Sequence, residues 1–513
     1  MLPQQFLDRM KGMMGNEYDS FLETYGQEPY QALRLNALKK RSEGRNAAEL
    51  SGSAETLGHR DTAKVPWAED CYYYEPSAQP GKHPYHQAGV YYIQEPSAMA
   101  PAQLLEVQPG ERVLDLCAAP GGKSTQIAAK LRGEGFLLCN EINASRAKIL
   151  SENVERMGIV NAYVTNETPE RLAEVFPEYF DKILVDAPCS GEGMFRKNEL
   201  ACEEWSPENV DMCAKRQDGI LDCAARMLRP GGRLVYSTCT FAPAENEGSV
   251  SRFLGRWPEF MTVPIAKEVF GTEHCNGSRE YLEKSMHSGE PCPELVGLQS
   301  EGLTTHDMTG DMSCLEHTLR LWPHLIRGEG HYIARLCRRG DAADGQKQRD
   351  AAEKQAVSGN MRWQITGEKK LCKLMEEFLA DELGIGGTWM ARHPGRVVRF
   401  GEQIYLLPEE MISLTGIKVL RPGLQLAVEK KNRLEPAHAL ARSLLTTDFP
   451  VGSGHMRGLT EREAVSYLRG ESIACGEEKG WMALSYEGYM LGFGKASGGQ
   501  VKNHYPKGLR KSL

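Results

Sequence analysis

Short apolar runs and longer amphipathic segments alternate between Gly110 and Leu254, and this alternation restricts the fold more than any other feature of the sequence. The apolar runs have the length of buried strands, while the segments between them carry the periodicity of helices. The expected strands are 113–116, 136–139, 162–164, 182–185 and 233–237, and the expected helices are 124–131, 144–157, 209–228 and 245–254. Strands that alternate with helices predict an α/β domain on a mainly parallel sheet.

Composition excludes several classes of protein. With 513 residues, 41% of them hydrophobic and 25% charged, the chain has the composition of a soluble protein with about three or four folded units. No stretch is long and apolar enough to span a membrane, and the N-terminus lacks a secretory signal, so we expect a cytoplasmic protein with no membrane partner. The fourteen cysteines include no CxxC pair, which indicates reduced thiols and no metal site. The net charge of −8 carries no sign of nucleic-acid binding, which depends on local basic surface.

Changes in composition divide the chain into five parts. We expect an N-terminal region at 1–92, the α/β domain at 93–338, a linker at 339–360, an intermediate C-terminal domain at 361–430 and a last domain at 431–513. Within them, residues 1–40 have a helical, amphipathic pattern. The stretch 42–64 is polar and predicts a loop, and 265–313 predicts an insertion of uncertain structure.

A glycine-rich loop joins the first strand to the first helix. Glycines let a backbone approach a ligand closely, and the following helix N-terminus offers free N–H groups. The ending Gly122-Lys123-Ser124 matches a nucleotide-binding P-loop, with 183–186 as its magnesium-holding strand. However, the first P-loop glycine would fall on Cys117, whose β-carbon would crowd a phosphate.

The same loop also suits the methyl-donor site of a Rossmann-like methyltransferase. There, an acid after the second strand holds the ribose hydroxyls, and Glu141 has that position here. The candidate cofactor contacts of the loop are Cys117, Ala118, Ala119, Pro120, Gly121, Gly122 and Lys123.

Two cysteines follow the fourth and fifth expected strands. Cys189 belongs to 186–191 (DAPCSG), and Cys239 belongs to 237–240 (STCT). Ligands of such sheets bind outside the carboxyl ends of the strands, so both thiols are expected in one crevice rather than as buried apolar groups. A thiolate that adds to carbon 6 of cytosine makes carbon 5 reactive toward a methyl donor, and Asp186 has the position to protonate N3.

These motifs closely resemble those of the Sun-type (NOP/Sun) RNA cytosine-5 methyltransferases. The resemblance implies a Rossmann-like class I methyltransferase domain that uses S-adenosyl-L-methionine. It implies Cys239 as the nucleophile, Cys189 as the residue that helps to release the product, and the 117–123 loop, Glu141 and Asp186 as cofactor contacts. Arg146 also matches and is expected to support the acid at 141, although a surface arginine of a helix is an equal reading.

One position departs from the family pattern. The family usually carries an acid after the third strand to hold the adenine side, whereas this chain has Asn166-Glu167-Thr168. Asn166 or Thr168 is then the candidate for a hydrogen bond to adenine.

The flanks resemble the bacterial RsmF branch of the family. The resemblance rests on 91–99, on 320–324 with 328–332, and on two C-terminal stretches that look like a PUA-like RNA-binding domain, 491–495 and 502–507. It implies an N-terminal α/β RNA-binding region, a C-terminal PUA-like β-rich domain, and a monomer that acts on small-subunit ribosomal RNA. Transfer RNA is the alternative substrate.

Several side chains in these flanks could contact RNA or line the site. From Lys495 onward the chain has basic residues with no acid, and with His504 and Tyr505 it is suited to phosphate contact and base stacking. His324 and His331 could line the site, but structural roles in their loop are favoured.

Two other functions remain alternatives at this point. A P-loop NTPase would bind ATP and magnesium and ignore S-adenosyl-L-methionine. A non-catalytic RNA-binding assembly factor would bind RNA without a methyl mark, but it would have no need of the two motif cysteines.

Overall fold

The computed structural model describes residues 2–39, 63–266, 270, 312–340, 368–408, 416–431 and 433–510. The polar loop expected at 42–64, the insertion expected at 265–313 and the linker expected at 339–360 lie almost entirely outside these described residues. Within them, no helix has the length and apolar character of a membrane span.

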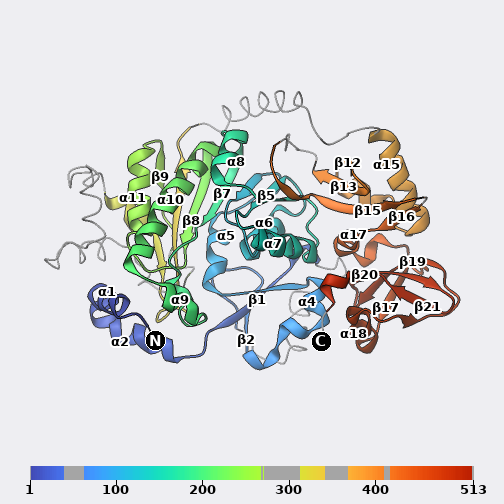
Figure 1. Cartoon of the computed structure of the whole chain (residues 1–513), viewed down its shortest axis with the longest axis horizontal. Helices are drawn as coiled ribbons and strands as arrows, with labels where there is room; N and C mark the ends of the chain where they lie inside the picture. The colour runs from blue at the N-terminus through green and yellow to red at the C-terminus, as the bar shows by residue number, and fades with distance from the viewer. Residues whose placement is uncertain are drawn as a thin grey trace.

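A sheet of nine strands forms the centre of the protein (Figure 1). Its order is β10-β11-β8-β7-β4-β5-β6-β14, and β9 pairs with β11. The five parallel strands confirm the Rossmann-like expectation; they are β4 (Arg112–Asp115), β5 (Phe136–Asn140), β6 (Ala162–Thr165), β7 (Phe180–Asp186) and β8 (Leu228–Thr238). Antiparallel β11 (His331–Arg338) lies beside β8, and β10 (Leu319–Leu321) and β9 (Phe260–Thr262) both pair with β11.

Helices cover both faces of this sheet. Neighbouring residues of a strand point to opposite faces, so Leu114 joins one apolar core and Val113 the other. The helices that share the Leu114 core are α8 (Pro169–Val175), α10 (Pro207–Met227) and α11 (Glu247–Arg256). The helices that share the Val113 core are α5 (Ala100–Leu104), α6 (Gly122–Leu131) and α7 (Ala144–Arg156). Because both faces are covered, each strand contains a run of apolar residues, which is why the sequence shows the strands clearly.

The N-terminal region begins with helices and continues as a sheet. The helical pattern is confirmed by α1 (Gln4–Met14) and α2 (Tyr18–Glu23), but it is wrong at β1 (Gln31–Leu35). β1 is the central strand between β2 (Cys71–Tyr74) and β3 (Tyr91–Gln94), and these distant partners leave no trace in the local pattern. The boundary expected after residue 92 therefore falls inside β3.

The C-terminal part contains two further sheets. The first has the order β12-β13-β15-β16, and the second has the order β17-β19-β20-β21-β18. The strands of the first are β12 (Gly395–Phe400), β13 (Gln403–Pro408), β15 (Leu424–Lys430) and β16 (Arg433–Pro436). The strands of the second are β17 (Met456–Leu459), β18 (Ile473–Ala474), β19 (Gly480–Tyr486), β20 (Tyr489–Ser497) and β21 (Gln500–Asn503).

Two observations correct the expected division of this part. The boundary expected between residues 430 and 431 falls inside the pairing of β15 with β16. In addition, β14 (Val419–Pro422) belongs to the expected 361–430 domain but pairs with β6 at the edge of the central nine-stranded sheet. Strand pairing between segments more than two hundred residues apart is invisible to composition, so the sequence suggested a separate domain where the chain returns to an earlier one.

The buried cation of Arg442 joins three parts of the chain. Arg442 lies on α17 (His438–Ser443) and donates hydrogen bonds to the carbonyl oxygens of Gln87, Arg156 and Met490. These carbonyls belong to the N-terminal region, the end of α7 and strand β20. Burial lowers the pKa of Arg442 to about 10, so the guanidinium still carries its charge near neutral pH.

We expect Arg442→Met to lower the free energy of unfolding by about 3–5 kcal/mol, because three buried carbonyl groups lose their donor. The measurement is urea unfolding at pH 7.5. The matched control is Arg433→Met, since Arg433 pairs with Glu435 at the surface with two thirds of its side chain exposed, and its loss should cost less than about 0.5 kcal/mol. Equal effects of the two substitutions would contradict the joining role.

Candidate active site

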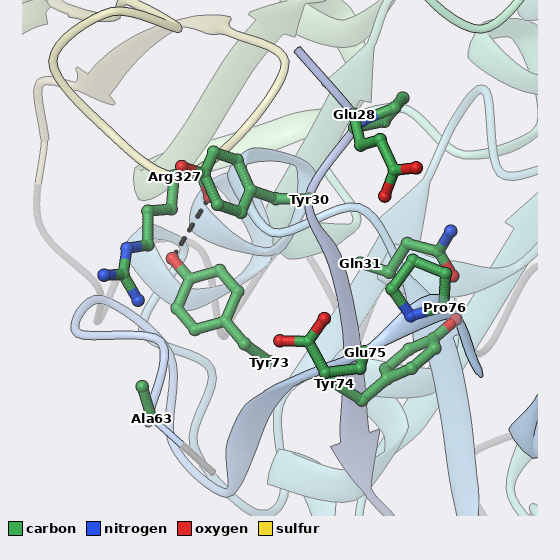
Figure 2. A pocket seen from close by; sticks show the side chains of 10 residues that line it. Glu28, Tyr30, Gln31, Ala63, Tyr73, Tyr74, Glu75, Pro76 and Arg327 are labelled. Carbon is green, nitrogen blue, oxygen red and sulfur yellow. Dashed lines mark hydrogen bonds between the residues drawn. The ribbon is translucent and has the colours of Figure 1, made fainter. Parts of the chain in front are cut away.

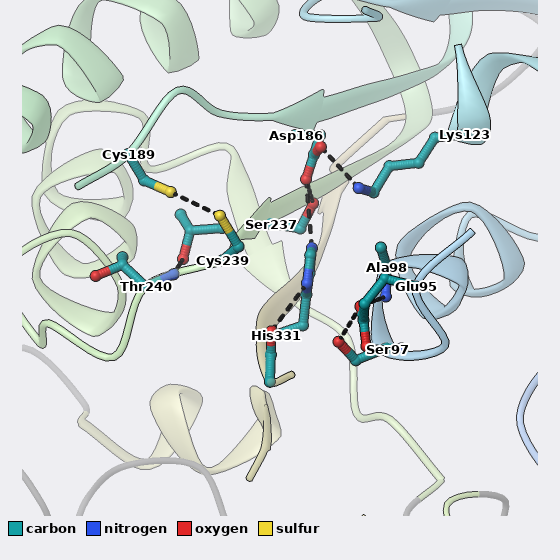
Figure 3. A network of polar contacts seen from close by, with 12 residues as sticks. Glu95, Ser97, Ala98, Lys123, Asp186, Cys189, Ser237, Cys239, Thr240 and His331 are labelled. Atoms are coloured by element: carbon teal, nitrogen blue, oxygen red, sulfur yellow. Dashed lines mark hydrogen bonds and ion pairs between the residues drawn. The ribbon is translucent and has the colours of Figure 1, made fainter. Parts of the chain in front are cut away.

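The two motif cysteines meet at the carboxyl ends of β7 and β8. Asp186 is paired with Ser237 in the parallel register, so the loops that follow these strands begin side by side. The Sγ atoms of Cys189 and Cys239 are 3.3 Å apart, and both cysteines are free thiols (Figure 3). The two thiols therefore lie together at this edge of the sheet.

A buried hydrogen-bond network holds the two cysteine loops together. The Ser190 hydroxyl contacts the Thr240 hydroxyl at 2.8 Å, and the Gly193 amide donates to the Cys239 carbonyl at 2.8 Å. The Glu245 carboxylate accepts a hydrogen bond from the Ser190 amide at 3.0 Å. Burial raises the pKa of Glu245 to about 7. The sequence reasoning missed Glu245; the available signal was an acid within an otherwise apolar stretch after the fifth strand.

The glycine-rich loop turns from β4 into α6 beside this crevice. Gly121 has a φ of +113°, which side-chain-bearing residues rarely adopt, and it directly precedes the helix. The Ala118 amide donates to the Asn140 carbonyl, which ties the loop to the end of β5. Residues 117–123 thus lie where the expected cofactor loop should be, and burial keeps the pKa of the Cys117 thiol well above its usual value.

Lys123 connects this loop to the catalytic strands. Its Nζ lies 2.7 Å from Asp186 Oδ2, while the Ser237 hydroxyl donates to Asp186 Oδ1 at 2.8 Å. Burial acts to raise the pKa of Asp186, but the charge of Lys123 and the ring of His331 outweigh burial and hold it well below its usual range. Asp186 is therefore a carboxylate at neutral pH.

Glu141 lies at the end of β5, in the position expected of a ribose-binding acid. Its Oε1 accepts from the Asn143 amide at 2.8 Å, and its Oε2 lies 3.3 Å from Arg146. Arg146 also donates to the Ala119 carbonyl at 2.7 Å. The arginine therefore supports both the acid and the glycine-rich loop, which favours the expected supporting role over a plain surface position.

Asn166 and Thr168, the candidates for the adenine side, use their polar groups within the protein. The Asn166 amide donates at 2.8 Å to the carbonyls of Glu141 and Ile142, and its Oδ1 accepts from Lys418 at 2.7 Å. Thr168 caps α8 by accepting from a backbone amide. Both N–H groups of Asn166 are therefore used within the protein, and only the second lone pair of Oδ1 is left to accept a hydrogen bond from adenine.

His331 lies in the site, and the favoured structural role in its loop is wrong. It begins β11, where Tyr332 is paired with Thr238, and its Nε2 lies 3.4 Å from Asp186 Oδ1. The sequence offered no sign of this contact because β11 lies far along the chain from β7. His324 instead pairs with Glu17 at 3.0 Å, away from the cysteines.

The C-terminal aromatic that was expected to stack on bases is buried. Tyr505 is 3% exposed, and its ring lies against those of His438 and Tyr467. Because the Tyr505 ring is buried, no base can stack on it, and this stacking expectation is wrong. Lys495 of β20 is paired with Lys502 of β21; Lys502 is exposed, whereas Lys495 is half-buried with its ammonium over the Trp481 ring.

Comparison with known protein families gives matches along most of the chain. The family described as 16S rRNA methyltransferase RsmB/F matches residues 102–337, and the N-terminal domain of 16S rRNA methyltransferase RsmF matches 2–96. The first C-terminal domain of RsmF rRNA methyltransferase matches 377–444, and the methyltransferase RsmF PUA domain matches 448–511.

Full-length relatives agree with these matches. The ribosomal RNA small subunit methyltransferase F of Shewanella amazonensis is 31% identical, with 96% of this chain and 94% of the relative covered. The protein of the same name from Klebsiella pneumoniae is 30% identical, with 99% and 96% covered. Among solved structures, a methyltransferase homologue from Pyrococcus horikoshii is 25% identical with a TM-score of 0.51, and the match covers 66% of this chain and 95% of that one.

Fold and site together define a Rossmann-like methyltransferase domain with an N-terminal domain and a C-terminal PUA domain. The chain belongs to the RsmF family of ribosomal RNA methyltransferases. This membership makes it an enzyme, and the P-loop NTPase and the non-catalytic assembly factor are no longer supported. Lys123, the residue that a P-loop would direct at phosphates, is paired with Asp186.

Glu245 gives the site a pH-dependent stability. Its folded pKa of about 7 lies above the ordinary value of 4.5, so its contribution is fully present below about pH 4.5 and is lost as the pH rises through 7. We expect Glu245→Gln, which mimics the protonated acid, to reduce the fall in unfolding free energy between pH 5 and pH 8 by about 2–3 kcal/mol. Urea unfolding at both pH values measures this. The control is Glu174→Gln, at an exposed acid, which should leave the difference in unfolding free energy between pH 5 and pH 8 as in the wild type. If Glu245→Gln also has the wild-type difference, Glu245 does not titrate as described.

Proposed function

We propose that the protein transfers a methyl group from S-adenosyl-L-methionine to carbon 5 of a cytosine in small-subunit ribosomal RNA, through a covalent bond between Cys239 and carbon 6. The observation that carries the cytosine chemistry is the pair of thiols 3.3 Å apart beside the Asp186 carboxylate. The names of the relatives, ribosomal RNA small subunit methyltransferase F, support the substrate.

The contact between the thiols supports their division of labour. A hydrogen bond to Cys239 and burial raise the pKa of Cys189 well above its usual value, so Cys189 keeps its proton. Lys123 lies close enough to Cys239 for its positive charge to stabilise a thiolate on that sulfur. Cys239 adds to carbon 6, and Cys189 is placed to take part when the carbon 5 proton leaves and Cys239 is expelled.

The loop residues fit the proposed cofactor. When bound, S-adenosyl-L-methionine supplies an electrophilic methyl group on a sulfonium. Glu141 would hold the ribose hydroxyls, and the 117–123 backbone would lie along the methionine part. Within the described residues, the buried Asp115 Oδ1 has no hydrogen-bond partner, and such an acceptor suits the ammonium group of an amino acid.

A cavity in the N-terminal region offers a place for RNA. It has a volume of about 220 Å³ and is lined by Tyr30, Tyr73, Tyr74 and Arg327, among others (Figure 2). The guanidinium of Arg327 lies over the Tyr73 ring at 5.9 Å, and Arg327 is four residues before His331 of the site. Aromatic rings and arginine planes are the groups on which unpaired bases stack, and the target cytosine must leave its own stack to reach Cys239.

Substitutions of the two cysteines are expected to block the reaction at different steps. Cys239→Ala should abolish methyl transfer, because no thiolate remains to activate the ring. Cys189→Ser should form the bond to carbon 6 but release it slowly, so that an RNA–protein adduct persists as a slowly migrating band on a denaturing gel. Cys337→Ser is the matched control: its sulfur contacts only a neighbouring backbone carbonyl, and it should retain wild-type turnover without an adduct. Normal turnover in Cys239→Ala would refute the nucleophile.

The substrate is tested by bisulfite sequencing of total RNA from cells with and without the gene. We expect at least one cytosine of 16S ribosomal RNA to lose its protection from deamination when the gene is deleted, and to regain it on complementation with the wild type but not with Cys239→Ala. Loss of protection confined to transfer RNA would favour that substrate instead. Unchanged protection everywhere would overturn the cytosine-5 assignment.

A further inference from the structure

His331 is a buried histidine between two carboxylates of the crevice. It is 5% exposed, and Figure 3 shows its ring between Asp186 and the segment that carries Glu95. Its Nε2 lies 3.4 Å from Asp186 Oδ1, and its Nδ1 lies 3.2 Å from the Gly330 carbonyl oxygen.

Both ring nitrogens of His331 therefore face oxygen acceptors. A neutral imidazole carries one N–H and can satisfy only one of these acceptors, whereas the imidazolium carries two. A ring placed against a carbonyl on one side and a carboxylate on the other has a hydrogen-bond acceptor for a proton on each nitrogen. The geometry therefore gives His331 a place for a second proton directly next to Asp186.

The other charged groups around the ring do not compete for this proton. Glu95 Oε1 accepts from the amides of Ser97 at 2.9 Å and Glu329 at 2.8 Å, and its Oε2 accepts from the Ala98 amide at 2.7 Å. Burial alone would raise the pKa of Glu95, but Lys197 and these hydrogen bonds outweigh it and lower that pKa. Glu329 is paired with Arg196 at 2.7 Å.

Asp186 is left as the group that can exchange a proton with His331. Lys123 faces the other oxygen of the same carboxylate, at 2.7 Å from Oδ2. Asp186 cannot begin the reaction as an acid, because its ion pair with Lys123 keeps it ionised. A proton for N3 of cytosine must then reach Asp186 during the reaction.

We propose that His331 is a positioning residue that stores the proton which Asp186 delivers to N3 of the target cytosine. When Cys239 forms its bond to carbon 6, the C5–C6 π electrons form a C4–C5 double bond and the C4–N3 π pair moves to N3. N3 takes a proton from Asp186, Asp186 takes one from His331 Nε2, and His331 becomes neutral. The negative charge of the thiolate and the positive charge of the imidazolium disappear together. When Cys239 leaves, the proton returns along the same path. This role rests on the proposed cytosine-5 function.

The test compares two bases in one RNA. In a Cys189→Ser background, the rate of adduct formation is measured on target RNA with cytosine or with 5-azacytosine at the modified position. The ring nitrogen of 5-azacytosine withdraws electrons from carbon 6, so addition depends less on a proton at N3. We expect His331→Gln to slow adduct formation about 100-fold with cytosine, as for loss of a general acid, but less than about tenfold with 5-azacytosine. His331→Asn should behave in the same way.

The controls separate this role from a structural one. The ratio of the two rates does not depend on the fraction of folded enzyme, so partial unfolding of a variant cannot imitate the result. His324→Gln, at a histidine whose side chain is 4% exposed and paired with Glu17, should keep the wild-type ratio. An equal loss with both bases, or a wild-type rate with cytosine, would overturn the proton-storing role. Absence of any adduct or 5-methylcytosine with unmodified His331 would instead overturn the proposed function itself.

Discussion

The parallel pairing of β7 with β8 is the constraint on which the rest of the site depends. In that register Asp186 stands beside Ser237, so the two loops that follow start from adjacent points of one sheet edge. Three residues further in one loop and two in the other bring Cys189 and Cys239 to 3.3 Å. A shift of this register would separate the thiols and move Asp186 away from Ser237, because every side chain at the edge is placed by its distance from the paired residues.

The sequence predicted the features that depend on neighbouring residues and missed those that depend on contacts between distant segments. The five parallel strands were recognisable because strands buried on both faces are continuously apolar, and the thiols, Asp186 and Glu141 were recognisable because they directly follow such strands. β1, β14 and the His331 contact were not, since each depends on pairing between segments far apart in the chain. Burial also decided matters that composition could not: Tyr505 looked like a stacking residue and is instead packed between parts of the protein.

Strand β14 shows how the C-terminal part takes part in the site without reaching the cysteines. The backbone of Asn166 donates to the Lys418 carbonyl, and Lys418 Nζ donates to the Asn166 side chain. Asn166 in turn holds the carbonyls of Glu141 and Ile142, which form the loop of the proposed ribose-binding acid. The position where the family usually has an acid is therefore occupied here by an amide that fixes the cofactor loop from both sides. A carboxylate at this position could not donate to these two carbonyls.

The charge balance of the crevice explains why one carboxylate needs so many neighbours. Lys123 keeps Asp186 ionised, which leaves a cation near the Cys239 sulfur but leaves the carboxylate without the proton that the proposed activation of cytosine at N3 requires. A carboxylate with a single cationic neighbour could stay ionised or receive a proton for N3, but it could not do both. The ammonium of Lys123 lies on Oδ2 and the imidazole of His331 lies on Oδ1, so each oxygen of Asp186 has its own neighbour: one oxygen faces a fixed charge, and the other faces the group proposed to give and regain a proton. The same reasoning explains why Glu95 is saturated by backbone amides, since a second free carboxylate beside His331 would bind the proton that Asp186 must pass on.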